Sequence, residues 1–426
     1  MKAATVLTFS FALACTACGG GGGGSAVTNP GTVTSGGSGG TTVAAPAIGA
    51  HPASQSVAAG TPVTFSVNAT GTAVTYQWRR DGAPIAGATS PSYTLPATTL
   101  EDRGSKWSVQ VRNAGGTVTS NEAVLTVSGL ELLAGSPTAS GSYDGTGAAA
   151  RFHEPFGLAV DGNGNVFAAD YYNQTIRKIS ASGQVTTFAG AAELHGRVDG
   201  TGQNARFTYP TGIAFDRAGN LFVADSALRL VRKISPQGVV TTIAQLPKGS
   251  SVDGQSSGMF QPSGIALDSL DNIYVTNGIG TRRIAPDSSY TILEGDDVRN
   301  DVPTSIVATV RGVALDGAGN VWVNSLQGDI RKLGQPDGVI PGTAGVQGYI
   351  ATDRAGNVYV ADHARYVVRK ITPDGKTSVI AGNGTAGYEI GPDLGAALPP
   401  PRGIAVDANG VLYVAVRHAI VKIYQP

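Results

Sequence analysis

Hydrophobic and polar residues alternate over short stretches in the segment of residues 46–128. VTFSV (63–67) and WSVQV (107–111) each place three hydrophobic side chains on one face of a strand. Turn residues such as Asp81 and Gly82 separate these stretches, and no hydrophobic period of 3.6 residues is present. We therefore expect residues 46–128 to form an all-β domain of the β-sandwich kind.

The remainder of the chain, residues 130–426, repeats one pattern of short hydrophobic stretches. Each unit consists of four predicted strands, which in the first unit are GLAVD, VFAAD, TIRKI and VTTFAG. The units begin at Pro155, Pro210, Pro262, Arg311, Gly348 and Arg402. Six four-stranded units predict an all-β, six-bladed β-propeller, an architecture that leaves only short strand edges exposed.

The last unit ends at Ile423 and Tyr424, before its fourth strand. A separate stretch, LELLAG (130–135), precedes the first unit and matches the pattern of a fourth strand. We therefore expect residues 130–135 to complete the last blade and to close the ring.

The six units resemble NHL repeats. The elements G-[IL]-A-x-D, G-N-[LV]-[FY]-V-A-D and [IV]-R-K-I recur in this order along residues 155–424. The resemblance implies a six-bladed propeller, which agrees with the count of the units.

Residues 46–128 resemble an immunoglobulin-like domain of the bacterial surface type, through GTPVTFSVNATG, YQWRRDGAPIAGATSPSYTL and EDRGSKWSVQVRNAGG. Trp78 matches the buried tryptophan of the third strand in that family. Val67 and Val109 stand where the family has its paired cysteines, and Trp107 stands at the tyrosine-corner position. The resemblance implies a spacer or adhesion domain without the inter-sheet disulfide.

The N-terminus, MKAATVLTFSFALACTACGGGGGGS, has one positive charge and a short apolar run, which predicts an export signal over residues 1–17. Cys18 follows a small residue and resembles the acylated cysteine of bacterial lipoproteins, although Cys15 replaces the usual leucine three positions before it. An ordinary secretory signal, with a soluble mature protein, is the alternative. Residues 18–45 are rich in Gly, Ser and Thr and predict a flexible tether.

The charge balance excludes one class of partner. The chain has 426 residues, with 30 Lys and Arg against 30 Asp and Glu, and only 14% of its residues are charged. No basic patch is present, so we expect no nucleic acid partner. With an acylated Cys18, the chain would be exported and lipid-anchored to the bacterial cell envelope, at the periplasmic or surface side of the outer membrane.

A glycine motif raises the possibility of a cofactor. GTGAAA (145–150) fits the G-x-G-x-x-A fingerprint of dinucleotide-binding folds, and a second copy begins at Gly200. Each copy, however, lies before a strand that starts with proline, and no helix follows it. We interpret both, and a decayed third copy at DGQSSGMFQP (253–262), as connections between blades. Phe152, Phe207 and Phe260 would fill gaps between blades, and we expect no cofactor.

Two series of polar residues recur with the blades. Asp161–Asn165 (DGNGN) and its equivalents resemble the start of a calcium loop, but they lack the later glutamate and fit hairpin turns better. Polar residues also end the second strands. In one interpretation they cap their turns or bond a neighbouring blade, and in the other they form the polar rim of a ligand site. These residues are Asp170, Asp225, Asn277, Asn324 and Asp362.

Four of the five histidines are expected at the same end of the propeller, because loops alternate between its two faces. They are His153, His195, His363 and His418. With Asp362 nearby, neutral imidazoles could bind a divalent metal or act as a base. Amidating lyases and streptogramin lyases resemble this propeller and use axial histidines, but no motif of theirs matches this sequence, so no role is carried over.

The sequence thus favours a surface-exposed lipoprotein whose propeller binds a protein or a glycan without catalysis. The alternative is a metal-dependent hydrolase or lyase that uses the histidines above, and a purely structural surface protein is a third possibility. No G-x-S-x-G, H-E-x-x-H or Walker motif is present.

Overall fold

The computed structural model describes residues 42–246, 261–277, 280–295, 310–325, 329–335, 339–346, 348–388 and 390–425. The predicted signal peptide, Cys18, and nearly all of the predicted tether lie outside the described residues. The described residues from Ala44 onward belong to one compact unit. No helix among the described residues is long and apolar enough to cross a membrane.

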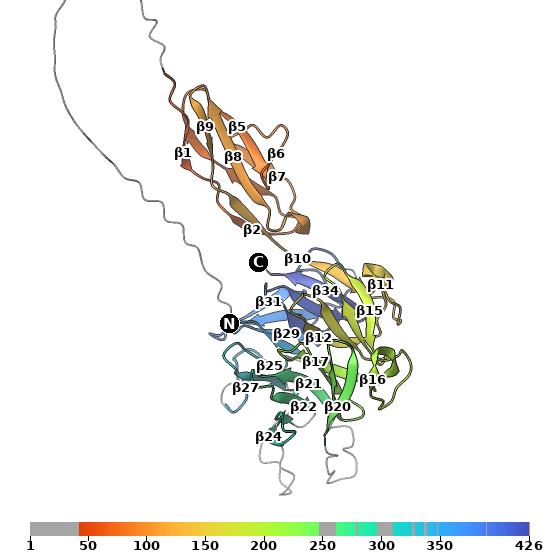
Figure 1. Cartoon of the computed structure of the whole chain (residues 1–426). Coiled ribbons are helices and arrows are strands. Elements are labelled where there is room, and N and C mark those ends of the chain that lie inside the picture. The colour runs from red at the N-terminus through yellow and green to blue at the C-terminus, as the bar shows by residue number, and fades with distance from the viewer. Residues whose placement is uncertain are drawn as a thin grey trace, which may run out of the picture. The chain divides into compact units, whose positions relative to one another are not determined.

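Residues 47–128 form short strands around one hydrophobic core (Figure 1). Trp78 and Trp107 are buried in this core together with Val67 and Val109. One short 3-10 helix, η1 (Leu100–Asp102), interrupts the strands, which are β1 (Ala47–Ala50), β2 (Gln55–Ala58), β3 (Val63–Ser66), β4 (Asn68–Thr70), β5 (Thr75–Arg80), β6 (Ala83–Pro84), β7 (Ser92–Leu95), β8 (Lys106–Asn113) and β9 (Gly116–Thr119).

The repeat region folds into antiparallel blade sheets, as the sequence predicts (Figure 1). Five sheets are separate blades. They are β12–β15 (Pro155–Val160, Val166–Asp170, Thr175–Ile179, Gln184–Ala189), β17–β20 (Pro210–Phe215, Leu221–Asp225, Leu230–Ile234, Val239–Gln245), β21–β24 (Pro262–Leu267, Ile273–Asn277, Gly280–Ile284, Tyr290–Gly295), β25–β27 (Val310–Leu315, Val321–Ser325, Ile330–Lys332) and β28–β31 (Ile350–Thr352, Val358–Asp362, Val367–Ile371, Thr377–Ala381).

The strands of the sixth repeat do not form a separate sheet, so the structure has five separate blade sheets where the sequence predicted six. These strands are β32 (Pro401–Val406), β33 (Leu412–Val416) and β34 (Ala419–Tyr424). They join a nine-stranded sheet through β10 (Ala123–Gly135), because β10 is long enough to pair with β8 and β2 at its start and with β34 at its end. The first strand, β32, packs against β12 on one side and against β28 and β29 on the other.

The end of β10 supplies the outer strand of this group. Residues 129–135 pair antiparallel with β34, from Gly129 opposite Tyr424 to Gly135 opposite Ala419. Leu130 lies in the core cluster between β28–β31 and β32–β34, and Leu133 lies in the next cluster, toward β12–β15.

The glycine motifs add short fifth strands to the outer edges of two blades. β11 (Gly145–Thr146) pairs with β15, and β16 (Gly200–Thr201) pairs with β20. Each is followed by one turn of 3-10 helix, η2 (Gly147–Ala149) or η3 (Gly202–Asn204). Phe152 and Phe207, further along each loop, are completely buried between neighbouring blades, as predicted. Phe260, the third phenylalanine of this prediction, lies outside the described residues.

Candidate functional site

The aspartate that ends the second strand of the first blade is buried in an ion-pair network. Asp170 is 0% exposed, and its Oδ2 accepts a hydrogen bond from Arg177 Nη1 at 2.9 Å. Arg177, also buried, donates through Nη2 to Asp144 Oδ1 at 2.7 Å, and its guanidinium lies over the Phe152 ring. Burial raises the pKa of Asp170, although the Arg177 charge and its hydrogen bonds lower it.

The second glycine motif repeats this network in the second blade. Arg232 donates to Asp225 at 3.1 Å and to Asp199 at 2.8 Å, and its guanidinium lies over the Phe207 ring. Burial raises the pKa of Asp225 to about 7, against hydrogen bonds from Thr208 and Arg232 that lower it. The DGTG motifs are therefore parts of an Asp–Arg–Asp network that fastens each loop to its blade.

The predicted polar rim is buried. The side chains of Asp362, Asn277 and Asn324 are inaccessible like those of Asp170 and Asp225. Asp362 accepts from Arg365 and Arg369, and Asn324 Nδ2 donates to the Gly348 carbonyl at 2.7 Å. Four of these residues therefore bond their own turns and neighbouring strands, which is the first of the two interpretations. Asn277 is buried like them, and none of the five presents its polar group at the surface.

Two of the predicted histidines lie together, on either side of a boundary between blades. The rings of His153 and His418 are 5.6 Å apart, edge to face. His418 directly precedes β34 and accepts a hydrogen bond on Nδ1 from the Glu154 N–H at 3.2 Å. In the next blade boundary Gln174 Oε1 accepts from the Tyr209 N–H at 2.7 Å in the same way. His418 thus occupies a position where the neighbouring blade uses a glutamine to bond the following loop.

The other two histidines are not placed in this group. His195 lies on an exposed loop, in a β-bridge with Phe207, and His363 is half-buried directly after β29. Among the residues that the structure describes, no three His, Cys, Asp or Glu side chains gather in a group that could hold a metal ion. The structure therefore brings together His153 and His418 and not the set of four.

The hydrogen bond to His418 predicts a pH dependence of folding stability. Burial, followed by the Arg417 charge, lowers the pKa of His418; His153 and Arg402 also lower it, and Glu154 raises it. A base with a lowered folded-state pKa contributes stability above its unfolded pKa of about 6.5, and loses it as the pH falls through the folded pKa. We expect the free energy of unfolding of the wild type, measured in urea, to fall from pH 7 to pH 5.

The matched variant is His418→Gln, because Gln174 makes the equivalent hydrogen bond without titrating. This variant should show a smaller loss of stability over the same pH range. Identical pH profiles for the two proteins would contradict the assigned role of His418.

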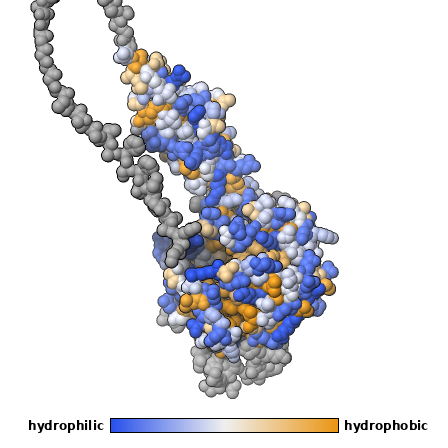
Figure 2. Space-filling view, in the orientation of Figure 1, coloured by the Kyte–Doolittle hydropathy of each residue, from blue (hydrophilic) through white to orange (hydrophobic). Residues whose placement is uncertain are grey.

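Aromatic rings gather beside these histidines, at the end of the propeller where the first strands begin. Tyr171 lies 4.6 Å from Phe156 and 4.9 Å from Tyr209, measured between ring centroids, and it is stacked on Tyr209. Tyr172 lies 4.9 Å from Tyr171 and 4.8 Å from His153. Together with Tyr349, these four rings form what we call the aromatic cluster. On the face of the molecule that Figure 2 shows, hydrophobic residues lie in groups among hydrophilic ones.

Tyr349 extends across the propeller axis. It precedes β28, and its ring lies 6.2 Å from Phe156 of β12. Its hydroxyl donates to the Ser263 carbonyl of β21 at 3.4 Å. Because β12, β21 and β28 are first strands of three different blades, Tyr349 joins three blades through its contacts with Phe156 and Ser263.

An ion pair borders the cluster. Glu154 Oε2 accepts from Arg402 Nη2 at 2.9 Å, and the Arg402 guanidinium lies 4.9 Å from the Phe156 ring centroid. Glu154 and Tyr209 both have left-handed backbones, with φ of 53° and 58°. Such strained residues persist only where surrounding contacts hold them, and they concentrate at functional sites. Their N–H groups are held by His418 and Gln174, as described above.

The aromatic cluster was not predicted from the sequence, although the repeats contain a signal for it. The residue before the hydrophobic-Ala pair of the first strand is tyrosine in the fifth unit, Tyr349, and glycine in the other units: Gly157, Gly212, Gly264, Gly312 and Gly403. A Cβ at Gly157 would overlap the Thr211 carbonyl of the neighbouring strand. A tyrosine where the other units have glycine is therefore not required by the fold, and such a departure from the repeat is a signal for a functional position.

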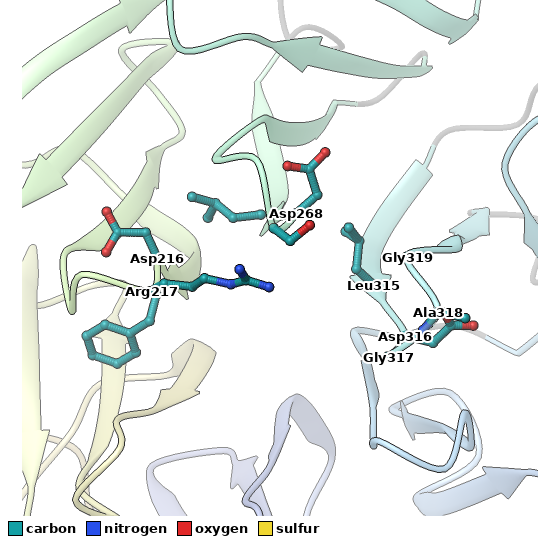
Figure 3. Close-up of a pocket in the computed structure, with 11 residues that line it drawn as sticks. Asp216, Arg217, Asp268, Leu315, Asp316, Gly317, Ala318 and Gly319 are labelled. Atoms are coloured by element: carbon teal, nitrogen blue, oxygen red, sulfur yellow. The ribbon is translucent and has the colours of Figure 1, made fainter.

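The opposite end of the first strands has a cavity of about 450 Å³ (Figure 3). Turns from three consecutive blades line it, with Asp216, Asp268 and Asp316 at equivalent positions. Each aspartate accepts hydrogen bonds from the asparagine four residues later, such as Asp268 from Asn272. These bonds outweigh the effect of burial and lower the pKa of Asp268. The DGNGN-type tracts are therefore turns held by their own aspartates, and Arg217 points into the space between them (Figure 3).

Comparison with known proteins supports an NHL-type β-propeller. The chain is 26% identical to the protein SUPPRESSOR OF QUENCHING 1, chloroplastic, of Arabidopsis thaliana. The aligned region has 299 residues and covers 66% of this chain. It is 32% identical over 133 residues, or 28% of this chain, to NHL repeat-containing protein 2 of Bos taurus. The chain spans only 26% and 18% of the length of these two relatives. No family model matches the chain.

Solved structures have the same fold. An auxiliary nutrient binding protein from Bacteroides ovatus superposes with a TM-score of 0.58 at 14% identity, covering 86% of this chain and 95% of the other. A protein of unknown function from Bacteroides thetaiotaomicron gives a TM-score of 0.55 at 19% identity, covering 89% and 98%. At these identities the likeness establishes the β-propeller fold and leaves the ligand open.

Proposed function

We propose that the chain is a cell-envelope lipoprotein whose propeller binds a protein or a glycan without catalysis. The aromatic cluster carries this proposal. Binding sites combine apolar and aromatic surface with a few positioned polar groups, and the cluster combines stacked rings with the Glu154–Arg402 pair. The name of the Bacteroides ovatus neighbour, an auxiliary nutrient binding protein, agrees with a binding role.

In this proposal residues 46–128 are an immunoglobulin-like spacer. Val67 and Val109, at the positions of the family's cysteines, lie in one core with Trp78. Trp107, at the tyrosine-corner position, donates its indole N–H to Ser105 Oγ at 2.8 Å. These contacts are those expected for a sandwich that has replaced its disulfide by hydrophobic packing.

We also infer that β32–β34 and the end of β10 act together as a sixth blade. The position of β32 between β12 and β28 supports this inference, since it continues the ring of first strands. The remaining parts of the proposal are the tether of residues 18–45 and a lipid on Cys18, at the periplasmic or surface side of the outer membrane.

Binding is tested with the full chain in detergent, against an array of soluble polysaccharides and an array of immobilised peptides. We expect saturable binding to one array, and mass spectrometry should recover the ligand unchanged. If neither array is bound, the proposal fails. If the ligand is cleaved and a chelator stops the cleavage, the metal-dependent hydrolase or lyase is the better function.

The anchor is tested separately by labelling cells with palmitate. Label should enter the wild type and be lost in Cys18→Ala, while Cys15→Ala keeps it. Loss of label only in Cys15→Ala would contradict the assignment of Cys18.

A further inference from the structure

The exposed rings of the aromatic cluster form a continuous surface of a size that suits a small ligand. Tyr172 is 45% exposed and Tyr209 is 37% exposed, while Phe156, Tyr171 and Tyr349 are half-buried below them. An aromatic side chain offers about 150–250 Å², so the exposed part of the five rings is on the order of 400 Å². A stable protein interface needs about 800 Å² from each partner, so the cluster alone is too small for one.

The charges around the cluster disfavour a cationic ligand. Ring faces attract cations, but the face of Phe156 already carries the Arg402 guanidinium. Glu154, the carboxylate beside the rings, is paired with Arg402. A second cation would therefore meet the Arg402 guanidinium and a carboxylate that is already paired.

The same charges fit an uncharged ligand that has both apolar faces and hydroxyl groups. Glu154 and Arg402 neutralise each other, yet the carboxylate can still accept hydrogen bonds and the guanidinium can still donate them. The tyrosine hydroxyls can do both. A pyranose ring offers a matching surface, with axial C–H groups that pack on aromatic faces and equatorial hydroxyls at its edge.

The surface is also held in place before a ligand arrives, which lowers the entropic cost of binding. The stack of Tyr171 and Tyr209 joins two blades, and the Tyr209 backbone is fixed by Gln174. Tyr349, bonded to Ser263, packs edge to face against Phe156. Burial raises the pKa of Tyr171, so its hydroxyl keeps its proton at neutral pH.

We propose that the aromatic cluster binds an uncharged oligosaccharide, whose sugar rings stack on Tyr172 and Tyr209 and whose hydroxyls bond Glu154 and Arg402. This inference rests on the proposed binding function and names the ligand class and the residues. It assigns the site to the end of the propeller where the first strands begin, and not to the cavity lined by Asp216, Arg217 and Asp268.

The test uses an array of neutral glucan, mannan, xylan and galactan oligosaccharides, with hexagalacturonate as the charged comparison. The best ligand is then titrated calorimetrically into the full chain and its variants. We expect Tyr172→Ala and Tyr209→Asn each to weaken binding about three- to tenfold, because each removes one stacking surface. Asparagine is chosen at position 209 because it tolerates the left-handed backbone.

The matched control is Tyr290→Ala, since Tyr290 is a 55% exposed tyrosine of β24 outside the cluster. It should bind as the wild type does, and circular dichroism should show all variants folded. Neutral-sugar binding that survives both cluster variants overturns the assignment to this site and leaves the binding function standing. Binding of hexagalacturonate alone, or of peptides alone, overturns the proposal that the ligand is an uncharged oligosaccharide. The binding function itself fails only if the peptide array is also unbound.

Discussion

Arg232→Ala is expected to lower the free energy of unfolding by about 3–5 kcal/mol. The guanidinium is completely buried and donates to Asp225, Asp199 and the carbonyls of Arg206 and Val198. Its removal leaves the buried Asp225 carboxyl without its cation and leaves two carbonyl groups without their donor. Urea unfolding, followed by circular dichroism, measures the loss.

The loss should grow as the pH rises above 7. Burial raises the pKa of Asp225 to about 7 in the wild type, and removal of the Arg232 charge should raise it further. Above pH 7 the wild-type carboxyl has lost its proton in both the folded and the unfolded state. In the variant, the Asp225 carboxyl still carries its proton in the folded state and has lost it in the unfolded state. The stability of the variant therefore continues to fall as the pH rises.

Lys233→Ala is the matched control for this variant. Lys233 is the next residue, and its ammonium lies over the Phe222 ring at 5.5 Å at the partly exposed surface. We expect a loss of only about 0.5–1 kcal/mol. Equal losses for the two variants would contradict the role of the Asp–Arg–Asp network.

Leu130→Ala should have the second large effect, a loss of about 2–5 kcal/mol in the stability of the propeller. Leu130 is 2% exposed and packs with Tyr359, Leu412 and Val421, so it joins the end of β10 to two sets of strands. Truncation leaves a cavity at the place where the ring closes. The unfolding transition of the propeller can be followed through Trp322, since Trp78 and Trp107 lie in the N-terminal segment.

The control lies on the same strand. Val124→Ala changes a 38% exposed residue near the start of β10, where the strand pairs with β8. Its effect should stay within about 0.5 kcal/mol. A propeller transition that does not move in Leu130→Ala would contradict closure of the ring through residues 129–135.

The repeats made the fold predictable, because each hydrophobic stretch recurs at the same place in every unit. The missing fourth strand of the last unit pointed to residues 130–135, which pair with β34. The length of β10 could not be predicted from the sequence. Nothing in the alternation marks that one strand continues from the N-terminal segment into the last group, which is why the structure has five separate blade sheets and not six.

The site was less predictable, because polar residue types do not reveal burial. In the sequence, Asp170 and Asp225 are compatible both with the polar rim of a ligand site and with a buried ion pair. Their arginine partners, Arg177 and Arg232, lie on the next strand and show that they form ion pairs. The aromatic cluster depends on contacts between residues far apart in sequence, such as Phe156 and Tyr349. Its trace in the sequence was the tyrosine at a position that is glycine in the other units.

The most direct measurement is a crystal structure of the chain with the neutral oligosaccharide that it binds best. We expect one sugar ring stacked on Tyr172 and another on Tyr209, since the two tyrosine rings lie edge to face, with hydroxyls within hydrogen-bond distance of Glu154 or Arg402. Sugar density in the opposite cavity, beside Asp216, Arg217 and Asp268, with the aromatic cluster empty, would contradict it.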